Sequence, residues 1–283
     1  MKKYFQKLIN FFGYNISKIK TIEKHDLDKI IKYICEKQQP VIFDVGANKG
    51  QSIERFKKMY KDCEIHSFEP GNVECEEMRS KYKNDNSVFI NNVGVGEKKE
   101  ILEFNIGAKS THSSFKQLLE KTTWIKKRSE VLNIKDEKYT ISKEKKKIIS
   151  LDNYVLENKI NLVDILKIDT QGYEDKVIAG AKNLIKENKI KIIQIEIIFS
   201  EIYEDPLNIY DIEKFLIPNG YKLFGFSNAG SLVNHHIFQS DFIYVSRDSY
   251  EEFKKKSEFF NNWKILWKKI INDDCSINHN QKI

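Results

Sequence analysis

Two acidic residues and a loop of small residues stand in an order that suits binding of a nucleoside. The apolar run Val41–Phe43 ends in Asp44 and opens into the loop DVGANKG, and the next apolar run ends in Glu69. Glycines let a backbone turn tightly and approach a ligand. An acid about 20 residues past such a loop commonly accepts hydrogen bonds from ribose hydroxyls. The predicted cofactor-binding residues are Asp44, Gly46, Ala47, Asn48, Gly50, Glu69, Pro70 and Asn92.

The spacing of the glycines indicates which nucleoside is bound. A dinucleotide loop reads G-x-G-x-x-G, whereas three residues separate Gly46 from Gly50 and no third glycine follows at the required place. A phosphate-binding P-loop needs GK[ST], but here Lys49 precedes the glycine and Gln51 follows it. An acid, a small-residue loop, a helix and a second acid are typical of class I S-adenosylmethionine-dependent methyltransferases. We expect Asp44 to face the cationic end of that cofactor.

Two acids are candidates for catalysis. Methyl transfer to a hydroxyl needs alignment of the acceptor and removal of its proton. Asp169 follows a predicted strand and is placed to act as a base or metal ligand, with helix N-capping as the alternative. Glu196 lies in an apolar strand, where a buried carboxylate needs a partner or has a functional role. A structural ion pair is the alternative for Glu196.

The histidines give weaker signals. His112 could be a base or a substrate contact, but we favour an exposed loop histidine. His235 and His236 lie in a late polar loop that could cap the pocket. No HxH or HExxH pattern occurs, so we predict no dedicated metal site.

Strand-like and helix-like segments alternate along the first part of the chain. The patterns predict helices over 26–36, 51–60 and 72–82, and strands over 41–44, 64–69 and 88–93. Such alternation predicts a parallel sheet with crossover helices. An extra strand over 101–106 and a polar, irregular insertion over 108–147 follow. We expect this insertion near the carboxyl edge of the sheet, where it would form the substrate-specific region.

The alternation resumes near residue 163. Strands are predicted over 163–168, 190–198, 221–226 and 241–245, and one helix after Gly172 carries apolar residues from Val177 to Ile185. We therefore predict a seven-stranded main sheet whose last strand is antiparallel. The fold class is α/β, with the Rossmann-like class I methyltransferase architecture.

Five motifs in order resemble the FkbM family of methyltransferases. They are DVGANKG, FEP, SLDNYV at 150–155, VDILKIDTQGYE at 163–174 and IIQIEI at 192–197. The resemblance covers residues 40–246 and implies a mostly parallel seven-stranded sheet with helices on both faces. It also implies S-adenosylmethionine as methyl donor and O-methylation of a sugar or small-molecule hydroxyl, for which we expect a place in surface-glycan biosynthesis. Many members carry Val-Glu where this chain has Thr170 and Gln171, whereas Asp169 and Glu174 remain in register.

Composition sets limits on partners and on location. The 283 residues include 48 Lys+Arg and 41 Asp+Glu, for a formal charge of +7. The clusters Lys126–Arg128 and Lys143–Lys147 could touch nucleic acid, an anionic glycan or anionic lipid, but we favour a solvated face. Because no aromatics interleave with these lysines, we do not expect nucleic acid as a partner. Four unpatterned cysteines, no secretory signal and no membrane-spanning run indicate a cytoplasmic protein.

The ends of the chain are predicted to flank the catalytic domain. We assign 1–39 to an N-terminal helical extension, 40–247 to the methyltransferase domain and 248–283 to an amphipathic helical tail. Apolar stripes at 4–12 and 259–271 could lie on the inner face of an anionic membrane. We favour packing on the domain or contact between copies in a homo-oligomer.

Three classes of function compete at this stage. The first is O-methylation of a small molecule or glycan. A nucleic-acid or protein methyltransferase is the second, but residues 169–172 read Asp-Thr-Gln-Gly rather than [DNS]PP[YF], and no cysteine follows a proline. The third is a noncatalytic nucleoside-binding module, against which the acids Asp44, Glu69 and Asp169 argue.

Overall fold

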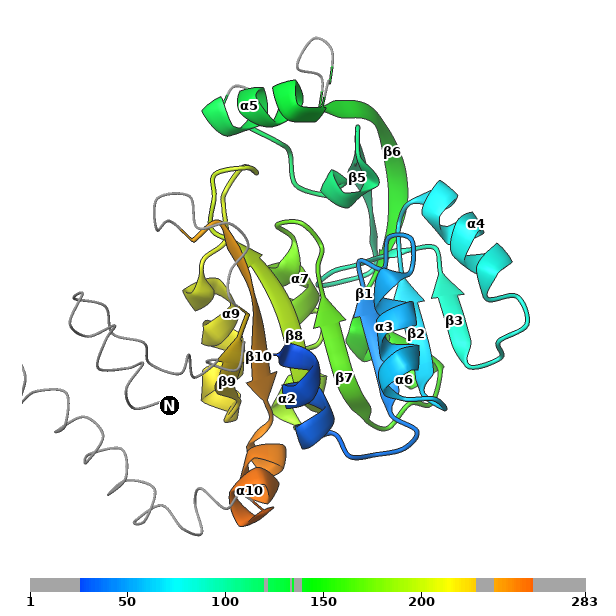
Figure 1. Ribbon diagram of the computed structural model, residues 1–283, viewed down its shortest axis with the longest axis vertical. Helices are drawn as coiled ribbons and strands as arrows, with labels where there is room; N and C mark the ends of the chain where they lie inside the picture. Colours follow the sequence, from blue (N-terminus) through cyan, green and yellow to red (C-terminus); the bar gives the residue numbers. More distant parts are fainter. Residues whose placement is uncertain (1–25, 120–121, 133, 135–138, 228–236, 257–283) are drawn as a thin grey trace, which may run out of the picture.

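The computed structural model describes residues 26–119, 122–132, 134, 139–227 and 237–256 (Figure 1). The predicted terminal stripes at 4–12 and 259–271, and the histidines His235 and His236, lie outside the described residues. Among the described residues, no helix is both long enough and apolar enough to cross a bilayer.

A seven-stranded sheet forms the centre of the molecule (Figure 1). In spatial order its strands are β3 (Val88–Asn91), β2 (Glu64–Phe68), β1 (Val41–Val45), β7 (Val163–Ile168), β8 (Ile190–Ile198), β10 (Gln239–Val245) and β9 (Lys222–Phe226). All neighbouring pairs are parallel except those that β10 makes with β8 and β9. The predicted strand count and the antiparallel last strand are therefore confirmed.

Helices cover both faces of this sheet, and its central strands are therefore largely buried on both sides. Every residue of β7 is buried, for example. One face packs against α2 (Leu27–Ile34), α3 (Gln51–Met59), α4 (Asn72–Lys81) and α10 (Arg247–Lys256). The other face packs against α6 (Leu151–Glu157), α7 (Glu174–Ala179), α8 (Lys182–Lys186) and α9 (Ile209–Leu216), and the short helix η3 (Ile217–Asn219) follows α9.

A second, smaller sheet rises beyond the carboxyl ends of β1 and β7 (Figure 1). Its strands, in spatial order, are β4 (Gly94–Val95), β6 (Thr140–Ile149) and β5 (Glu100–Gly107), and it is accompanied by η1 (Ser110–His112) and α5 (Thr123–Leu132). The prediction that 108–147 is irregular is wrong over 140–147, which belongs to β6. Lysines occupy both faces of this strand, because Lys146 is buried while Lys145 and Lys147 are exposed. The alternation of polar and apolar residues that marks a strand is therefore not visible in the sequence.

The single helix predicted after Gly172 is also wrong, because the chain forms two short helices, α7 and α8, that break at Gly180. A Cβ at Gly180 would lie 2.0 Å from the main-chain oxygen of Gly96, so the glycine allows two backbones to approach. After the break, the Asp152 carboxylate accepts hydrogen bonds from the amides of Asn183 and Leu184 and so caps α8.

Candidate active site

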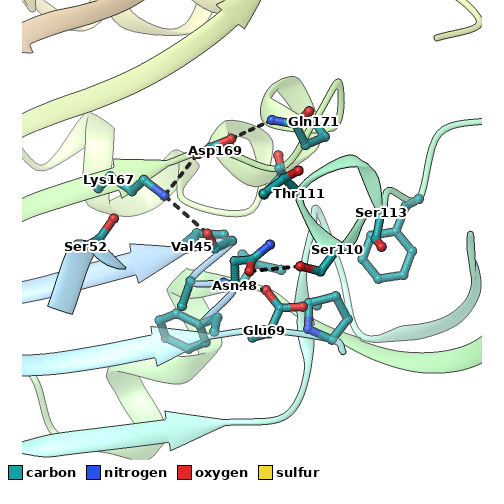
Figure 2. A pocket seen from close by; sticks show the side chains of 18 of the residues that line it. Val45, Asn48, Ser52, Glu69, Ser110, Thr111, Ser113, Lys167, Asp169 and Gln171 are labelled. Carbon is teal, nitrogen blue, oxygen red and sulfur yellow. Dashed lines mark hydrogen bonds and ion pairs between the residues drawn. The ribbon is translucent and has the colours of Figure 1, made fainter. Parts of the chain in front are cut away.

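A cavity of about 300 Å³ lies at the carboxyl ends of β1, β2 and β7, beneath the small sheet (Figure 2). The strands β1 and β7 are neighbours in space although the chain leaves β1 toward β2, which makes this a topological switch point. Of the predicted site residues, six line the cavity: Gly46, Ala47, Asn48, Glu69, Pro70 and Asp169. The remaining five lie outside the lining: Asp44, Gly50, Asn92, His112 and Glu196.

The loop after β1 forms the floor of the cavity. Gly46 has a φ of +79°, and a Cβ there would lie 1.9 Å from the main-chain oxygen of Asp169. The amides of Gly46 and Ala47 both donate to the main-chain oxygen of Phe68, which ties the loop to the end of β2. Gly50, with a φ of +80°, precedes α3 and packs against Met78 instead of the cavity.

Glu69 joins the ends of two strands through its carboxylate. Oε2 accepts a hydrogen bond of 2.8 Å from the Asn48 amide, and Oε1 accepts one of 2.7 Å from the Gly71 amide. A carboxylate has about four acceptor sites, so lone pairs remain for a ligand in the cavity. Burial raises the pKa of Glu69 to about 7 against the effect of these two amides. Asn92 supports this turn from behind, because its Nδ2 donates to the main-chain oxygens of Glu69 and Pro70.

Lys167 stands between two acids, and it was not predicted as a site residue. Its Nζ lies 3.3 Å from Asp44 Oδ1. It also lies 3.3 Å from Asp169 Oδ2 and donates to the main-chain oxygen of Gly46 (Figure 2). Burial alone would lower the pKa of Lys167, but the two carboxylates raise it above its usual range. Burial raises the pKa of Asp44, and Lys167 opposes that shift. Asp44 is fully buried, so it can influence the cavity only indirectly, by pairing with Lys167.

Asp169 points its carboxylate into the cavity from the end of β7 (Figure 2). A third of its side chain is exposed, and Oδ1 accepts a hydrogen bond of 2.8 Å from Gln171 Nε2. Burial would raise the pKa of Asp169, but the charge of Lys167 and the bond from Gln171 lower it below its usual range. The capping alternative does not hold, because α7 begins at Glu174 after Tyr173.

Glu196 lies behind Asp169 on β8, outside the cavity lining. Its Oε1 accepts from Gln239 Nε2 at 2.8 Å and its Oε2 from Gln171 Nε2 at 3.1 Å. The expected partners are therefore amide groups rather than a cation. Burial, followed by the neighbouring charges of Asp169 and Asp241, raises the pKa of Glu196 to about 9. The raised pKa favours the protonated form of Glu196.

The roof of the cavity comes from the segment after β5. Ser110, Thr111 and Ser113 line it, and Ser110 Oγ donates to Asn48 Oδ1 at 3.2 Å (Figure 2). His112 lies among them outside the lining, half-buried, with its ring 5.3 Å from that of Tyr139. Beyond the serines, the rings of Phe104 and Phe115 lie 4.8 Å apart and complete the apolar side of the cavity.

Residues that were not among the predicted site residues hold the β7–α7 loop. Glu174 accepts from the amide of Thr170 at 2.9 Å and from the amide of Gly172 with both oxygens. Gln171 sits in this loop with a φ of +57°. No distinctive local pattern marks these roles, because a lysine inside an apolar strand and an acid after a glycine also occur in proteins where they serve stability alone. Among the described residues, no group of three or more metal-ligating side chains is placed to hold a metal ion.

The order of the seven strands, with the sole antiparallel strand β10 between β8 and β9, defines a class I methyltransferase fold. The cavity fits S-adenosylmethionine, because Gly46 lets the loop after β1 pack against the end of β7 and Glu69 keeps acceptor sites for a ribose. The chain belongs to the FkbM family, since a family model described as the methyltransferase FkbM domain matches residues 44–223. The protein is therefore a methyltransferase, and S-adenosylmethionine is its cofactor.

Solved methyltransferase structures resemble the chain in fold alone. An rRNA methylase from Streptococcus thermophilus is 8% identical with a TM-score of 0.43, over 81% of this chain and 99% of that one. The precorrin-6y C5,15-methyltransferase of Geobacter metallireducens is 10% identical with a TM-score of 0.38, over 82% and 93%. Fibrillarin from Aeropyrum pernix, with S-adenosylmethionine natively bound, is 10% identical with a TM-score of 0.37, over 74% and 67%. No curated protein matches the chain significantly.

Proposed function

We propose that this methyltransferase transfers its methyl group to a hydroxyl of a neutral sugar or a similar small molecule. The observation that carries this proposal is the polar side of the cavity, where the Asp169 carboxylate faces a roof of hydroxyl side chains (Figure 2). Ser110, Thr111 and Ser113 can donate to and accept from the hydroxyls of a sugar.

The charges at the cavity favour a neutral acceptor over an anionic one. Among the described residues that line the cavity, Lys167 carries the one positive charge, and two carboxylates already pair with it. A phosphate or carboxylate next to Asp169 would therefore meet repulsion without a free cation to offset it. The resemblance to FkbM methyltransferases supports a sugar acceptor and a place in surface-glycan biosynthesis.

The chain must orient the reactants and remove one proton. When bound, S-adenosylmethionine would supply a methyl group on its sulfonium for transfer to the acceptor oxygen, and the electron pair of the carbon–sulfur bond would stay with sulfur. Asp169 is ionised because Lys167 lowers its pKa, so it can accept a hydrogen bond from the acceptor hydroxyl. An aspartate of low pKa is a weak base. It takes the proton late, when the oxygen has gained positive charge and its proton has become acidic.

Methyl transfer from labelled S-adenosylmethionine to a panel of acceptors tests the proposal. The panel contains neutral methyl glycosides, nucleotide sugars, oligosaccharides, RNA and a protein mixture, and the product is identified by the NMR signal of its methyl group. An O-methyl signal on a neutral sugar, lost in Asp169→Asn, is the expected result. Labelling confined to RNA, to protein or to a nitrogen atom would overturn the assignment.

A further inference from the structure

The side-chain amide of Gln171 bridges two carboxyl groups. Its Nε2 donates to Asp169 Oδ1 at 2.8 Å and to Glu196 Oε2 at 3.1 Å. A glutamine amide has two N–H donors, which is enough to serve both carboxyl groups. Asp169 faces the cavity while Glu196 lies behind it, and Gln171 therefore fixes the position of one carboxyl group relative to the other.

The orientation of this amide is fixed from its other end. Tyr203 donates its hydroxyl to Gln171 Oε1 at 3.2 Å, which places the nitrogen rather than the oxygen against the two acids. Burial, followed by the nearby carboxyls of Glu174, Asp169 and Glu196, raises the pKa of Tyr203 well above its usual range. Tyr203 therefore stays protonated and remains a donor.

The main chain at Gln171 is held in a conformation that residues other than glycine rarely adopt. Its φ is +57°, in the left-handed region that favours glycine. The Glu174 carboxylate accepts from the amides on both sides of Gln171, those of Thr170 and Gly172. Ser114 Oγ donates to the main-chain oxygen of Gln171 at 2.7 Å. Strain that is held by three separate anchors indicates a position with a functional requirement.

The two carboxyl groups lie close to one another, because one nitrogen atom, Gln171 Nε2, contacts an oxygen of each. Two ionised carboxylates that close repel one another, so the arrangement favours one shared proton. Lys167 determines which of the two acids is ionised, because its Nζ lies 3.3 Å from Asp169 and stabilises the ionised form of that residue. The bonds that Glu196 accepts are from neutral amides, so the proton resides on Glu196.

Other charged and titratable groups around the pair favour the same distribution. Asp241 on β10 is the cross-strand partner of Glu196 and raises its pKa. Glu174 from α7 also opposes a second negative charge at Glu196. Lys167 lies between Asp44 on β1 and Asp169, and its positive charge compensates for the negative charges of both acids. Among the described residues, the pair thus has the acidic neighbours Asp241, Glu174 and Asp44, and the basic neighbour Lys167 is on the side of Asp169.

We propose that Gln171 is a positioning residue that holds Asp169 and Glu196 as one carboxyl pair sharing a single proton, with Asp169 ionised toward the acceptor. This inference rests on the proposed O-methylation for its role in turnover. The acceptor proton goes to Asp169, so the pair passes from one proton to two and returns to one when a proton leaves to solvent.

The first experiment needs no acceptor. Carboxyl-carbon NMR of the full chain, labelled in Asp and Glu side chains and saturated with S-adenosylhomocysteine, reports each protonation state directly. Asp169→Asn and Glu196→Gln assign the two signals. At neutral pH we expect Glu196 protonated and Asp169 ionised. Two ionised signals at neutral pH would overturn the shared proton and leave O-methylation standing.

Two substitutions at Gln171 separate positioning from simple packing. Gln171→Glu adds a like charge, and Gln171→Met removes both donors at similar volume, so both should raise the pKa of Asp169. We expect the acidic limb of the pH–rate profile to move up by about one unit or more in Gln171→Glu, and turnover to fall about 10- to 100-fold. The acceptor in these assays is the neutral glycoside that the panel identifies. The pKa of Asp169 measured by NMR titration should shift by the same amount as the acidic limb.

Gln239→Met is the matched control, because it removes an amide bond to Glu196 without touching Asp169. It should raise the pKa of Glu196 and leave the acidic limb in place. Cofactor affinity and thermal unfolding show whether each variant is folded. If Gln171→Glu does not fold, Gln171→Met alone tests the positioning role. An unmoved Asp169 titration in a folded Gln171 variant would overturn the positioning role. A shifted titration without O-methylation of any glycoside would instead overturn the proposed function and leave the carboxyl pair standing.

Discussion

The main-chain amide of Asn48 donates a hydrogen bond of 2.8 Å to Glu69 Oε2. This bond joins the loop after β1 to the end of β2 through a buried carboxylate, and the Gly71 amide occupies the second oxygen. The acid expected to bind a ribose therefore also shapes the loop that lines the cavity. Removing it affects both the ligand and the floor of the cavity.

Glu69→Ala should weaken cofactor binding by about 2–4 kcal/mol, because charge-assisted hydrogen bonds to both ribose hydroxyls are lost in a partly dehydrated site. Titration calorimetry with S-adenosylhomocysteine measures this loss, and circular dichroism checks the fold. Unchanged affinity in a folded variant would remove the ribose assignment. Tighter binding of NAD than of S-adenosylhomocysteine by the wild-type chain would contradict the methyltransferase assignment itself.

Cofactor affinity should depend on pH near neutrality. Burial raises the pKa of Glu69 to about 7, and ribose hydroxyls donate to the ionised form, so binding favours loss of that proton. Affinity for S-adenosylhomocysteine should therefore fall as pH drops below about 7, approaching tenfold per unit, and level off above it. Glu69→Gln is the control and should show weak binding without this dependence. A wild-type affinity that is flat between about pH 5.5 and 8 would contradict the prediction.

The fold was predictable because its signals are local. Apolar runs of strand length and the helical stripes between them specify seven strands, and the chain order of acids and glycines predicts a ligand site at the strand ends where the cavity lies. The small sheet was only half predicted, since Lys143–Lys147 conceals the alternation of β6 that pairs with β5. The break at Gly180 depends on contact with Gly96, which no local pattern contains.

The site was predictable as a set of acids but not as a set of contacts. The position of Asp169 followed from the strand end before it. The roles of Lys167 and Gln171 did not, because each depends on residues distant in sequence, Asp44 for the first and Glu196 for the second. Asp44 itself was expected to face the cofactor, and the structure instead buries it against Lys167. Tertiary packing determines whether an acid at the end of a strand faces the cavity or is buried behind it.

Asp169→Asn should cut turnover by roughly 10²- to 10⁴-fold while cofactor affinity stays within several-fold. Asparagine is nearly isosteric but cannot accept the proton, and it loses the attraction to Lys167. Steady-state kinetics with the accepted glycoside and calorimetry with S-adenosylhomocysteine give the two quantities. A fully active Asp169→Asn enzyme would eliminate both the base and the metal-ligand role.

A chelator should leave wild-type activity unchanged. Lys167 and Gln171 already engage the two oxygens of Asp169, and a divalent cation there would stand next to the ammonium group of Lys167. Activity that is lost with a chelator and restored by a divalent cation would contradict this and assign Asp169 to metal binding.

Asp164, at the opposite end of β7 from the cavity, should matter for stability alone. It is fully buried, pairs with Lys37 and Lys191 at 2.8 and 2.9 Å, and accepts from the Val41 amide. Both lysines are partly exposed and can return to water, so Asp164→Asn should cost only about 1–3 kcal/mol in the free energy of unfolding. Urea unfolding measures the cost, and cofactor affinity should not change.

The pH dependence of that cost has a definite sign. Burial would raise the pKa of Asp164, but Lys37, the Val41 amide and Lys191 lower it below its ordinary value. A lowered pKa in the folded state contributes stability above the unfolded pKa, and this contribution is lost as pH falls through the folded value. The difference between wild type and Asp164→Asn should therefore be largest at neutral pH and shrink in acid. A difference that grows in acid would contradict the direction of this shift.

Lys167→Met should destabilise the protein far more, and in a way that depends on its acidic neighbours. Methionine preserves much of the volume but leaves the buried Asp44 without its cation, at a cost of about 3–5 kcal/mol in the free energy of unfolding. Without Lys167 the pKa values of Asp44 and Asp169 rise, so both acids protonate at higher pH and the loss should shrink as pH falls. Urea unfolding at several pH values measures this. The double variant Lys167→Met/Asp44→Asn removes a buried charge together with its partner and should recover part of the stability, whereas an equal loss at every pH with no recovery would show that Lys167 stabilises the fold by packing rather than by charge.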